Sequence, residues 1–363
     1  MMSERFYGET PEGIPVTEYT LDNNQGIEIK IINYGCTITS LIVPDRDGHP
    51  DDIVLGFDAL EGYMASTHYF GSIIGRFANR IADGSFVLDG QEYKVAKNLN
   101  HHHLHGGIKG FDKVVWQSHE FENEEGVGVE LQYLSPDGEE GYPGNLSVHI
   151  LYFLNQRNEI TLDYKAITDK KTIINLTQHS YFNLNGGREN ILRHELLINS
   201  DHFLSLDKTM IPTGELTGDL KDVPGTPFNF GIFKMIGRDI NSKDPRLENA
   251  HGYDHMWVLD KQADELAHAA TLYEPSTGRA LEVYTTEPGL QLYTGNFLDD
   301  KKGKNGSVYG PYSGLCLETQ HFPDSPHHPE FPSVELKPGD EYRSRTVWKF
   351  SVRDSSTHPI RET

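Results

Sequence analysis

The stretch LSVHILYFLNQRNEITLDYKAI, residues 146–167, contains two segments in which apolar or aromatic residues alternate with polar ones. Alternation at a period of two is typical of β-strands that bury one face. The same pattern, rich in β-branched and aromatic residues, covers residues 26–35, 36–45, 85–95, 127–136, 280–297 and 342–352. The sequence therefore predicts many short strands.

Turn signals separate these stretches, and helical patterns are weak. Asp-Gly, Asn-Gly and Pro-Gly pairs lie between the predicted strands, and the chain holds 35 glycines and 19 prolines, which suits a fold with many turns. Only residues 58–66 and 231–240 suggest helices, and both are short. No linker, composition break or internal repeat divides the chain. We therefore predict an all-β sandwich or barrel formed by one domain, residues 1–363.

The acidic composition restricts the partners of the protein. The 363 residues include 32 Lys and Arg against 54 Asp and Glu, so the formal net charge is −22. Because the chain has no run of five or more basic residues, neither a nucleic acid nor an anionic membrane surface is an expected partner. A phosphorylated sugar would be repelled at long range, although a local arginine could override that repulsion.

Cysteine usage and the N-terminal residues bear on location. Cys36 and Cys316 are too few for a disulfide framework, which favours a reducing compartment. The opening residues, MMSERFYGETPEG, contain no apolar stretch typical of a secretory signal. No apolar run approaches the ~20 residues of a membrane-spanning helix. We therefore predict a cytoplasmic location.

Two segments carry side chains suited to proton transfer near neutral pH. NLTQHSYFNLNG, residues 175–186, places His179 among polar neighbours in a strand-like stretch, where it is either a satisfied core histidine or part of a wet cavity. GPYSGLCLETQHFPDSPHHP, residues 310–329, places Glu318 directly after an apolar run. Burial at the end of such a strand would raise the pKa of the carboxyl and make it a better base. The alternative is a salt-bridged glutamate.

A histidine-rich segment, NHHHLHGGIKGFDK at residues 100–113, suggests a metal site at first sight. We discount a metal because neighbouring side chains in a strand or loop point apart. His101 and His102 are expected to lie at the surface. His105 differs because Gly106 and Gly107 follow it, and glycines let a ligand or another backbone approach closely.

Further polar residues could recognise hydroxyl groups. Asp254 in HGYDHMWVLD could accept hydrogen bonds from a sugar, and Trp257 could pack on its apolar face. Asn79 and Arg80 in GRFANRIADGSF could donate to sugar oxygens. Gln291 in EPGLQLYTGNF could bind a hydroxyl. Each has a structural alternative, namely a turn cap, a loop tie and an ordinary strand residue.

These segments together resemble the aldose 1-epimerase family, also called the galactose mutarotases. The resemblance extends over almost the whole chain. It includes NYGCTITSLIVPDRDG, YFGSIIGRFANRIADGSF, LHGGIKGFDKVVW, NLTQHSYFNLNG, GYDHMWVLD, PGLQLYTGNF and CLETQHFPDSPHHPEFPS. It implies a large antiparallel β-sandwich with few helices that interconverts the anomers of free aldoses such as glucose and galactose.

The resemblance also implies roles for individual residues. Glu318 would be the general base, His179 the general acid, and His105 would assist at the ring oxygen. The hydroxyl-binding residues would be Asn79, Arg80, Asp254 and Gln291. No metal and no other cofactor is implied. Two departures from the family pattern bear on the sugar preference: the histidines before LHGG, and Met256 where a polar residue often stands.

Three other functions remain open at this stage. A glycoside hydrolase could use Asp254 and Glu318 as its pair of carboxyls. A sugar-binding module could keep the pocket without turnover, although binding alone needs no acid–base pair. An epimerase of phosphorylated hexoses is disfavoured by the acidic charge. Neither the preferred aldose nor the oligomeric state can be read from the sequence.

Overall fold

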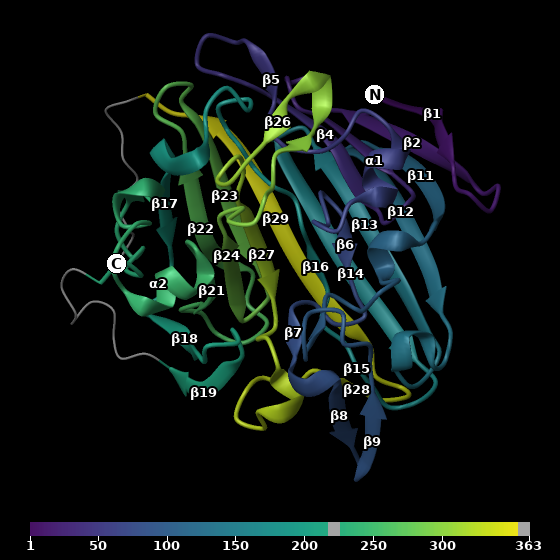
Figure 1. Cartoon of the computed structure of the whole chain (residues 1–363). Helices are drawn as coiled ribbons and strands as arrows, with labels where there is room; N and C mark the ends of the chain where they lie inside the picture. The colour runs from purple at the N-terminus through teal and green to yellow at the C-terminus, as the bar shows by residue number, and fades with distance from the viewer. Residues whose placement is uncertain (217–225, 355–363) are drawn as a thin grey trace.

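The computed structural model describes residues 1–216 and 226–354, and strands dominate it (Figure 1). The described residues contain two α-helices, α1 (Leu60–Ala65) and α2 (Pro245–Ala250). The predicted helix at residues 58–66 is therefore confirmed. Residues 231–240 hold no α-helix, because strand β20 (Lys234–Met235) and a single 3-10 turn (Ile236–Arg238) occupy that stretch.

The largest element is a nine-stranded antiparallel sheet. Its order is β11 (Gln117–Asn123), β12 (Gly126–Ser135), β13 (Leu146–Asn155), β14 (Glu159–Thr168), β29 (Tyr342–Val352), β23 (Arg279–Thr285), β22 (Ala267–Tyr273), β17 (Glu195–Ile198) and β20. The last strand of the described residues, β29, thus lies in the middle of the sheet between β14 and β23. Residues 146–167 form β13 and most of β14, as predicted.

Two smaller antiparallel sheets have five strands each. One runs in chain order through β1 (Met2–Glu9), β2 (Pro15–Asp22), β3 (Glu28–Ile32), β4 (Thr37–Pro44) and β5 (Pro50–Asp52). The other has the order β19 (Pro212–Leu216), β18 (His202–Leu206), β21 (Asp254–Val258), β24 (Gly289–Tyr293) and β27 (Cys316–Gln320). We call the latter the site sheet.

Short strand pairs and turns complete the fold. The pairs are β6 (Ile73–Ile74) with β16 (Thr177–Gln178), β7 (Arg80–Ile81) with β10 (His103–Leu104), β8 (Ser85–Leu88) with β9 (Gln91–Lys94), β15 (Thr172–Ile173) with β28 (Glu335–Leu336), and β25 (Lys301–Lys302) with β26 (Val308–Tyr309). Further 3-10 turns cover Ala82–Gly84, Phe111–Lys113, Glu139–Gly141, Ile191–Arg193, Lys304–Gly306 and Ser325–His327.

One hydrophobic core joins the three large sheets. Ile31 of β3, Ile150 of β13 and Leu290 of β24 all belong to the same buried cluster. Along β13, buried and half-buried residues alternate, so one face of the nine-stranded sheet is covered and the other faces outward. The predicted all-β sandwich is therefore confirmed: the two five-stranded sheets pack on the covered face.

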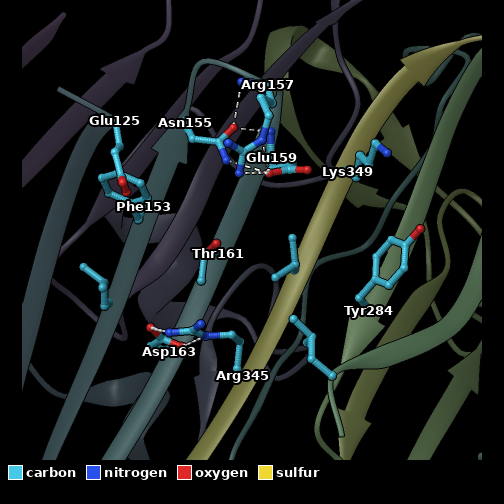
Figure 2. A pocket seen from close by; sticks show the side chains of 13 residues that line it. Glu125, Phe153, Asn155, Arg157, Glu159, Thr161, Asp163, Tyr284, Arg345 and Lys349 are labelled. Atoms are coloured by element: carbon cyan, nitrogen blue, oxygen red, sulfur yellow. Dashed lines mark hydrogen bonds and ion pairs between the residues drawn. The ribbon is translucent and has the colours of Figure 1, made fainter. Parts of the chain in front are cut away.

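The outer face of the nine-stranded sheet carries a separate shallow groove of about 480 Å³ (Figure 2). Asp163 of β14 and Arg345 of β29 form a two-point ion pair across it, at 2.6 and 2.7 Å. Tyr284 and Lys349 line the same groove.

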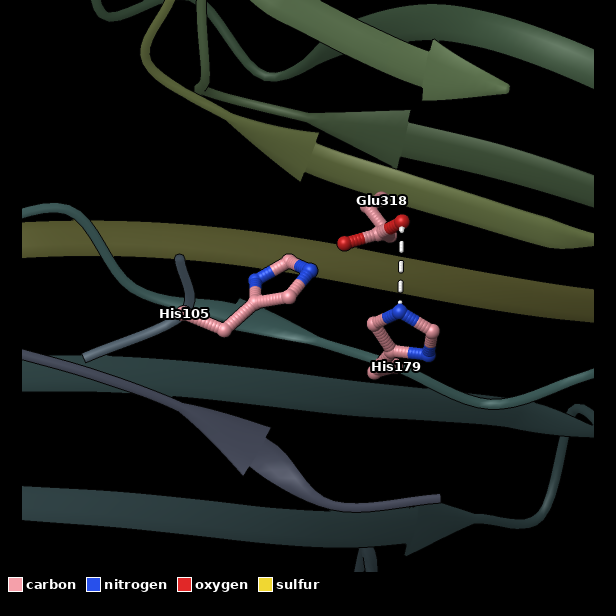
Figure 3. Close-up of side chains that lie close together, drawn as sticks. All are labelled: His105, His179 and Glu318. Carbon is pink, nitrogen blue, oxygen red and sulfur yellow. Dashed lines mark ion pairs between the residues drawn. The ribbon is translucent and has the colours of Figure 1, made fainter. Parts of the chain in front are cut away.

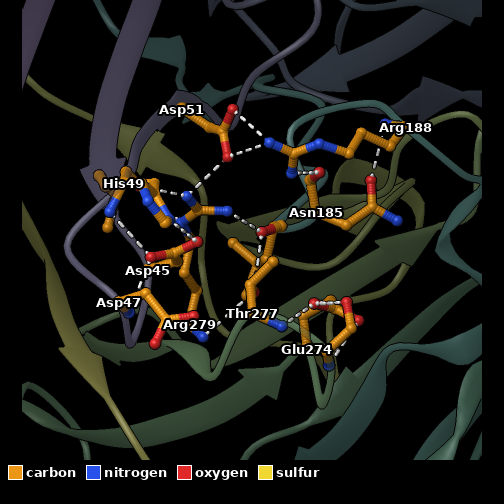
Figure 4. Close-up of polar contacts among 12 residues, drawn as sticks. Asp45, Asp47, His49, Asp51, Asn185, Arg188, Glu274, Thr277 and Arg279 are labelled. Atoms are coloured by element: carbon orange, nitrogen blue, oxygen red, sulfur yellow. Dashed lines mark hydrogen bonds and ion pairs between the residues drawn. The ribbon is translucent and has the colours of Figure 1, made fainter.

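A buried arginine of the nine-stranded sheet forms hydrogen bonds with the sheet of β1–β5 (Figure 4). Arg279, at the start of β23, is fully buried and donates to the carbonyls of Val43 and Leu184 at 3.0 and 2.9 Å. Its Nη2 also donates to Asp51 of β5 at 2.7 Å. Arg188 contacts the same carboxylate at 2.8 Å. Removing Arg279 would take one hydrogen-bond donor from each of these acceptors and would therefore destabilise the contact between the two sheets.

No helix in the described part of the chain combines the length and the apolar character that a membrane-crossing helix needs.

Candidate active site

One face of the site sheet presents polar side chains, whereas the other face joins the core. Gln291 pairs with Met256 on one side and with Glu318 on the other, so the three side chains form a row across β21, β24 and β27. Residues one position along each strand point the opposite way. Accordingly, Leu290 and Leu317 belong to the core. Strand periodicity therefore directs Gln291 and Glu318 toward a common site.

Glu318 is the buried carboxyl of this row. It is 2% exposed and lies in the middle of β27, not at the strand end that the sequence suggested. Burial raises the pKa of Glu318 well above its usual range; the negative charge of Asp254 raises it further, and Arg80 opposes the shift. Within the described residues, Oε2 of Glu318 has no hydrogen-bond partner. The carboxyl thus has an oxygen available for a ligand.

His179 faces Glu318 from the other side of the site (Figure 3). Its Nε2 lies 3.7 Å from Oε1 of Glu318. The backbone around it is fixed, because its N–H donates to the Ser72 carbonyl at 2.9 Å and its carbonyl accepts from Gly71 at 3.0 Å. Burial lowers the pKa of His179 to about 4. The imidazole is therefore neutral in the free protein at neutral pH.

His105 completes the group, with its ring centroid 5.3 Å from that of His179. Gly106 makes this placement possible: a Cβ there would lie 1.9 Å from the Gly75 carbonyl oxygen, and its φ of 83° suits glycine. Nδ1 of His105 accepts a hydrogen bond from the backbone N–H of Asn79 at 3.1 Å. Burial lowers the pKa of His105 well below its usual value, and the nearby His179 and Arg80 add to the shift.

The four predicted binding residues form one connected group. Arg80 Nη2 lies 3.3 Å from Asp254 Oδ2, and Gln291 Nε2 donates to Asp254 Oδ1 at 2.6 Å. Asn79 Oδ1 accepts from the backbone N–H of Arg80 at 2.9 Å. This group reaches the acid–base residues at both ends, since Asn79 donates to His105 and Gln291 is the strand neighbour of Glu318. The structure thus brings all seven predicted site residues together.

Polar atoms remain unused in this group. Nε of Arg80 and Oε1 of Gln291 are buried and have no hydrogen-bond partner among residues 1–216 and 226–354. Buried polar groups are normally satisfied. Two such atoms beside Glu318 Oε2 are therefore best explained by a polar ligand that binds here.

A cavity of about 480 Å³ opens beside Arg80 and Asp254. Lys208, Asn249 and Phe297 also line it, and all three are exposed. The volume lies in the usual range for small-molecule sites. The cavity therefore borders the polar group at Arg80 and Asp254 and is large enough for a monosaccharide, whereas the buried His105, His179 and Glu318 are not among its lining residues.

Two expectations about neighbouring residues are wrong. Trp257 is fully buried in the core cluster and does not face the site. It is three residues from Asp254 on β21, and an odd spacing puts two side chains on opposite faces of a strand. His102 is buried as well, and its Nδ1 accepts from the backbone N–H of Asp83 at 3.1 Å. His101 is exposed, as predicted.

The three acid–base residues also form a possible metal-binding group. Their ligand atoms all lie within 4.8 Å of one another, and two imidazoles with a carboxylate are a donor set that transition metals accept. A metal would need a lone pair on Nε2 of His105. Because Nδ1 of His105 already accepts from Asn79, the hydrogen of the neutral ring is on Nε2. The group is thus better arranged to exchange hydrogen with oxygen atoms than to coordinate an ion.

Two site residues were missed in the sequence. Tyr69 packs edge-on against His105 at 4.7 Å between centroids and lies 5.7 Å from His179. Cys316 places Sγ 3.5 Å from Nδ1 of His179. No sequence pattern marks Tyr69. Cys316 could have been found, because it is two positions from Glu318 and therefore on the same face of β27.

Burial of neutral histidines should make the protein less stable in mild acid. The pKa is lowered to about 4 for His103, His179, His194 and His255, and the pKa of His105 is also well below its usual value. The unfolded chain binds protons at these positions below pH 6.5, whereas the folded chain does so only near pH 4. The free energy of unfolding should therefore fall as the pH falls through this window, by up to ~3 kcal/mol for each fully buried ring.

The opposing groups are fewer: the pKa of Asp112 is raised to about 6, and the pKa values of Glu318, His321 and His327 are raised as well. Urea unfolding at pH 7 and pH 5 would measure the balance. We expect a lower midpoint at pH 5, and an equal or higher midpoint would contradict the prediction.

Comparison with known proteins decides the family. The family model for aldose 1-epimerase matches residues 17–349. A galactose mutarotase of Bos taurus is 47% identical over 349 residues, which cover 95% of this chain and 97% of that protein. The chain belongs to the aldose 1-epimerase family. An aldose 1-epimerase of Escherichia coli (strain K12) is 36% identical over 342 residues, covering 94% of this chain and 96% of its own length.

A solved structure agrees with this membership of the aldose 1-epimerase family. The crystal structure of a galactose 1-epimerase from Lactobacillus acidophilus NCFM matches with a TM-score of 0.85 and 30% identity. The match covers 97% of this chain and 99% of that one. The resemblance noted in the sequence and the mutarotase-like β-sandwich are both confirmed.

Proposed function

We propose that this member of the aldose 1-epimerase family interconverts the α and β anomers of free aldoses such as glucose and galactose. The observation that supports this most directly is the pair formed by Glu318 and His179, whose Oε1 and Nε2 atoms face each other at 3.7 Å inside a buried polar site. Ring opening of a cyclic sugar needs one group that removes the proton of the anomeric hydroxyl and one that protonates the ring oxygen. A carboxyl and an imidazole supply both.

The proton balance of the pair suits this reaction. Because burial raises the pKa of Glu318 and lowers that of His179, the free pair carries one proton on the carboxyl. Moving this proton to Nε2 of His179 creates an acid and a base without changing the net charge of the site. Arg80 favours the second arrangement, since its positive charge stabilises the ionised carboxyl. The macroscopic pKa values belong to the pair as a whole.

The catalytic cycle then follows. Glu318 removes the proton of the anomeric hydroxyl while His179 protonates the ring oxygen, and the bond between C1 and that oxygen breaks. The open-chain aldehyde rotates about C1–C2. The same two groups act in the reverse direction and close the ring on the other face of the carbonyl. Nε2–H of His105 can donate to the developing alkoxide of the ring oxygen, which lowers the barrier further.

The remaining residues would hold the sugar. We assign hydroxyl binding to Asn79, Arg80, Asp254 and Gln291. Both carboxylate oxygens of Asp254 already accept hydrogen bonds, one from Gln291 and one from Arg80. That arrangement suits a fixed acceptor for hydroxyls and is unfavourable for the protonated acid that a glycoside hydrolase requires.

Two further proposals concern the domain organisation and the location of the protein. We propose that the chain is a single domain, because one core cluster contains residues of all three large sheets. We also keep the predicted cytoplasmic location as a proposal, supported by Cys36 and Cys316, which are both free thiols.

Anomer exchange measures the activity directly. Freshly dissolved α-D-glucose or α-D-galactose should change its optical rotation faster with the protein than without it, at the same pH and buffer. A nitrophenyl glycoside should release no nitrophenol. Sugar binding without faster exchange would favour a binding module, and release of the phenol would favour a hydrolase.

Asp254→Asn should weaken sugar binding and shift the pH profile. Losing a charged hydrogen-bond acceptor should raise KM about 10–100-fold. The negative charge of Asp254 raises the pKa of Glu318, so its removal should lower that pKa and move the alkaline limb of kcat to lower pH. Kinetics across a pH series would measure both effects.

Asp163→Asn is the matched control, because Asp163 is also paired with an arginine but lies on the outer face of the large sheet. Its kinetics should equal those of the unmodified protein. An unchanged KM in Asp254→Asn would exclude the assigned role.

A further inference from the structure

Two side chains of strand β27 lie next to the two nitrogens of the His179 imidazole. Cys316 and Glu318 are two positions apart and therefore project from the same face of the strand, about 7 Å from each other along it. Sγ of Cys316 lies 3.5 Å from Nδ1 of His179, and Oε1 of Glu318 lies 3.7 Å from Nε2. Cys316 is thus the neighbour of one ring nitrogen, and Glu318 is the neighbour of the other.

The hydrogen shared by Nδ1 and the thiol is placed by what lies on the other side of the ring. Nε2 faces Oε1 of Glu318, and burial favours the protonated form of that carboxyl. A protonated carboxyl donates and therefore needs an acceptor, so Nε2 has the lone pair of the neutral ring and Nδ1 carries the hydrogen. The sulfur of Cys316 is then the acceptor for Nδ1–H.

His105 is in the opposite state. Its Nδ1 accepts from the backbone N–H of Asn79, so its neutral ring carries hydrogen on Nε2. The two histidines of the site, whose centroids are 5.3 Å apart, are thus held as different tautomers. One is a fixed hydrogen-bond donor, and the other can receive a proton from Glu318 and pass it on.

We propose that Cys316 is a positioning residue that keeps hydrogen on Nδ1 of His179, so that Nε2 alone exchanges protons with Glu318 and the sugar. This role deepens the proposed anomer exchange and rests on it. If the thiol instead donated its hydrogen to Nδ1, the neutral ring would carry hydrogen on Nε2, and the proton of Glu318 would meet an N–H group. The pair could then not form its acid and base by an internal transfer.

The tautomer can be observed without any activity. Long-range ¹H–¹⁵N correlation spectra of the protein labelled with ¹⁵N-histidine distinguish the nitrogen that carries hydrogen from the one that does not. Comparison with the His179→Gln variant identifies the signals of His179. At neutral pH we expect Nδ1 to be the protonated nitrogen. A hydrogen on Nε2 instead would overturn the proposal, and this outcome does not depend on whether the protein is an epimerase.

Variants of the thiol test its effect on turnover. Cys316→Ala removes the acceptor and should lower kcat about tenfold, the usual effect of losing one hydrogen bond, with KM changed by less than about twofold. Its spectrum should show mixed tautomers of His179. Cys316→Ser keeps an acceptor at the same place and should restore most of kcat and the Nδ1–H signal.

Cys36→Ala is the control, because Cys36 is an equally buried free thiol that belongs to the main core cluster. It should change neither kcat nor the His179 signals. A Cys316→Ala protein with unchanged kcat and tautomer would overturn the proposal. If the unmodified protein failed to exchange anomers, the proposed function would fail while the spectra would still report the tautomer.

Discussion

Glu318→Gln should lower kcat for anomer exchange by about 10⁴-fold. The amide has nearly the same shape as the carboxyl and still forms hydrogen bonds, but it cannot remove the proton of the anomeric hydroxyl. Sugar affinity should stay within about threefold of the original value, because only an interaction of the transition state is lost. Exchange between the anomers of glucose, followed by NMR at several enzyme concentrations, gives the rate; titration calorimetry gives the affinity.

Glu287→Gln provides the matched control. Glu287 is also a buried glutamate beside a histidine, with Oε2 2.6 Å from Nδ1 of His321, but it has no place in the site. Its loss should reduce stability and leave kcat unchanged. An active Glu318→Gln protein would show that the base lies elsewhere, and equal losses in both variants would point to a general effect on folding.

His179→Gln should lower kcat about 10³-fold, because the ring oxygen would lose its proton donor. The effect should be smaller than that of Glu318→Gln, since Nε2–H of His105 remains available to stabilise the developing alkoxide. KM should change little. The measurement is again the NMR exchange rate, with subtraction of the spontaneous reaction in the same buffer.

His194→Gln is the corresponding control. His194 is fully buried, its pKa is also lowered to about 4, and its Nε2 accepts from the backbone N–H of Leu184 at 2.9 Å. It should lower the unfolding midpoint and leave the turnover of folded protein intact. A His179→Gln protein as active as the His194→Gln protein would remove His179 from the mechanism.

Strands with an alternating pattern could be predicted from the sequence, whereas several strands without it could not. β13 and β14 alternate between covered and exposed residues, so their period is visible. β22, with the sequence AHAATLY, is buried over five consecutive residues and shows no alternation. Strands of two residues, such as β6 and β16, are too short to have a period at all. The order of strands within each sheet depends on pairing between distant segments, so the residue pattern of a single segment could not predict it.

The identities of the site residues followed from the motifs, but their arrangement did not. Sequence alone could not place Gln291 beside Glu318, because that contact results from the register of β24 and β27. Trp257 was misplaced although the alternation of β21 separates it from Asp254. The same rule would have placed Cys316 next to Glu318. The rule that residues two positions apart lie on the same face of a strand would thus have improved the predicted site most.

The central position of β29 has a consequence for biosynthesis. Its partners β14 and β23 are far apart in the chain and are joined in one sheet only through residues Tyr342–Val352. A ribosome must therefore release the chain as far as Val352 before the middle of the largest sheet can close. Contacts of such long sequence separation fold slowly and leave strand edges open meanwhile. Nascent chains of this protein should need protection from aggregation until β29 has left the ribosome.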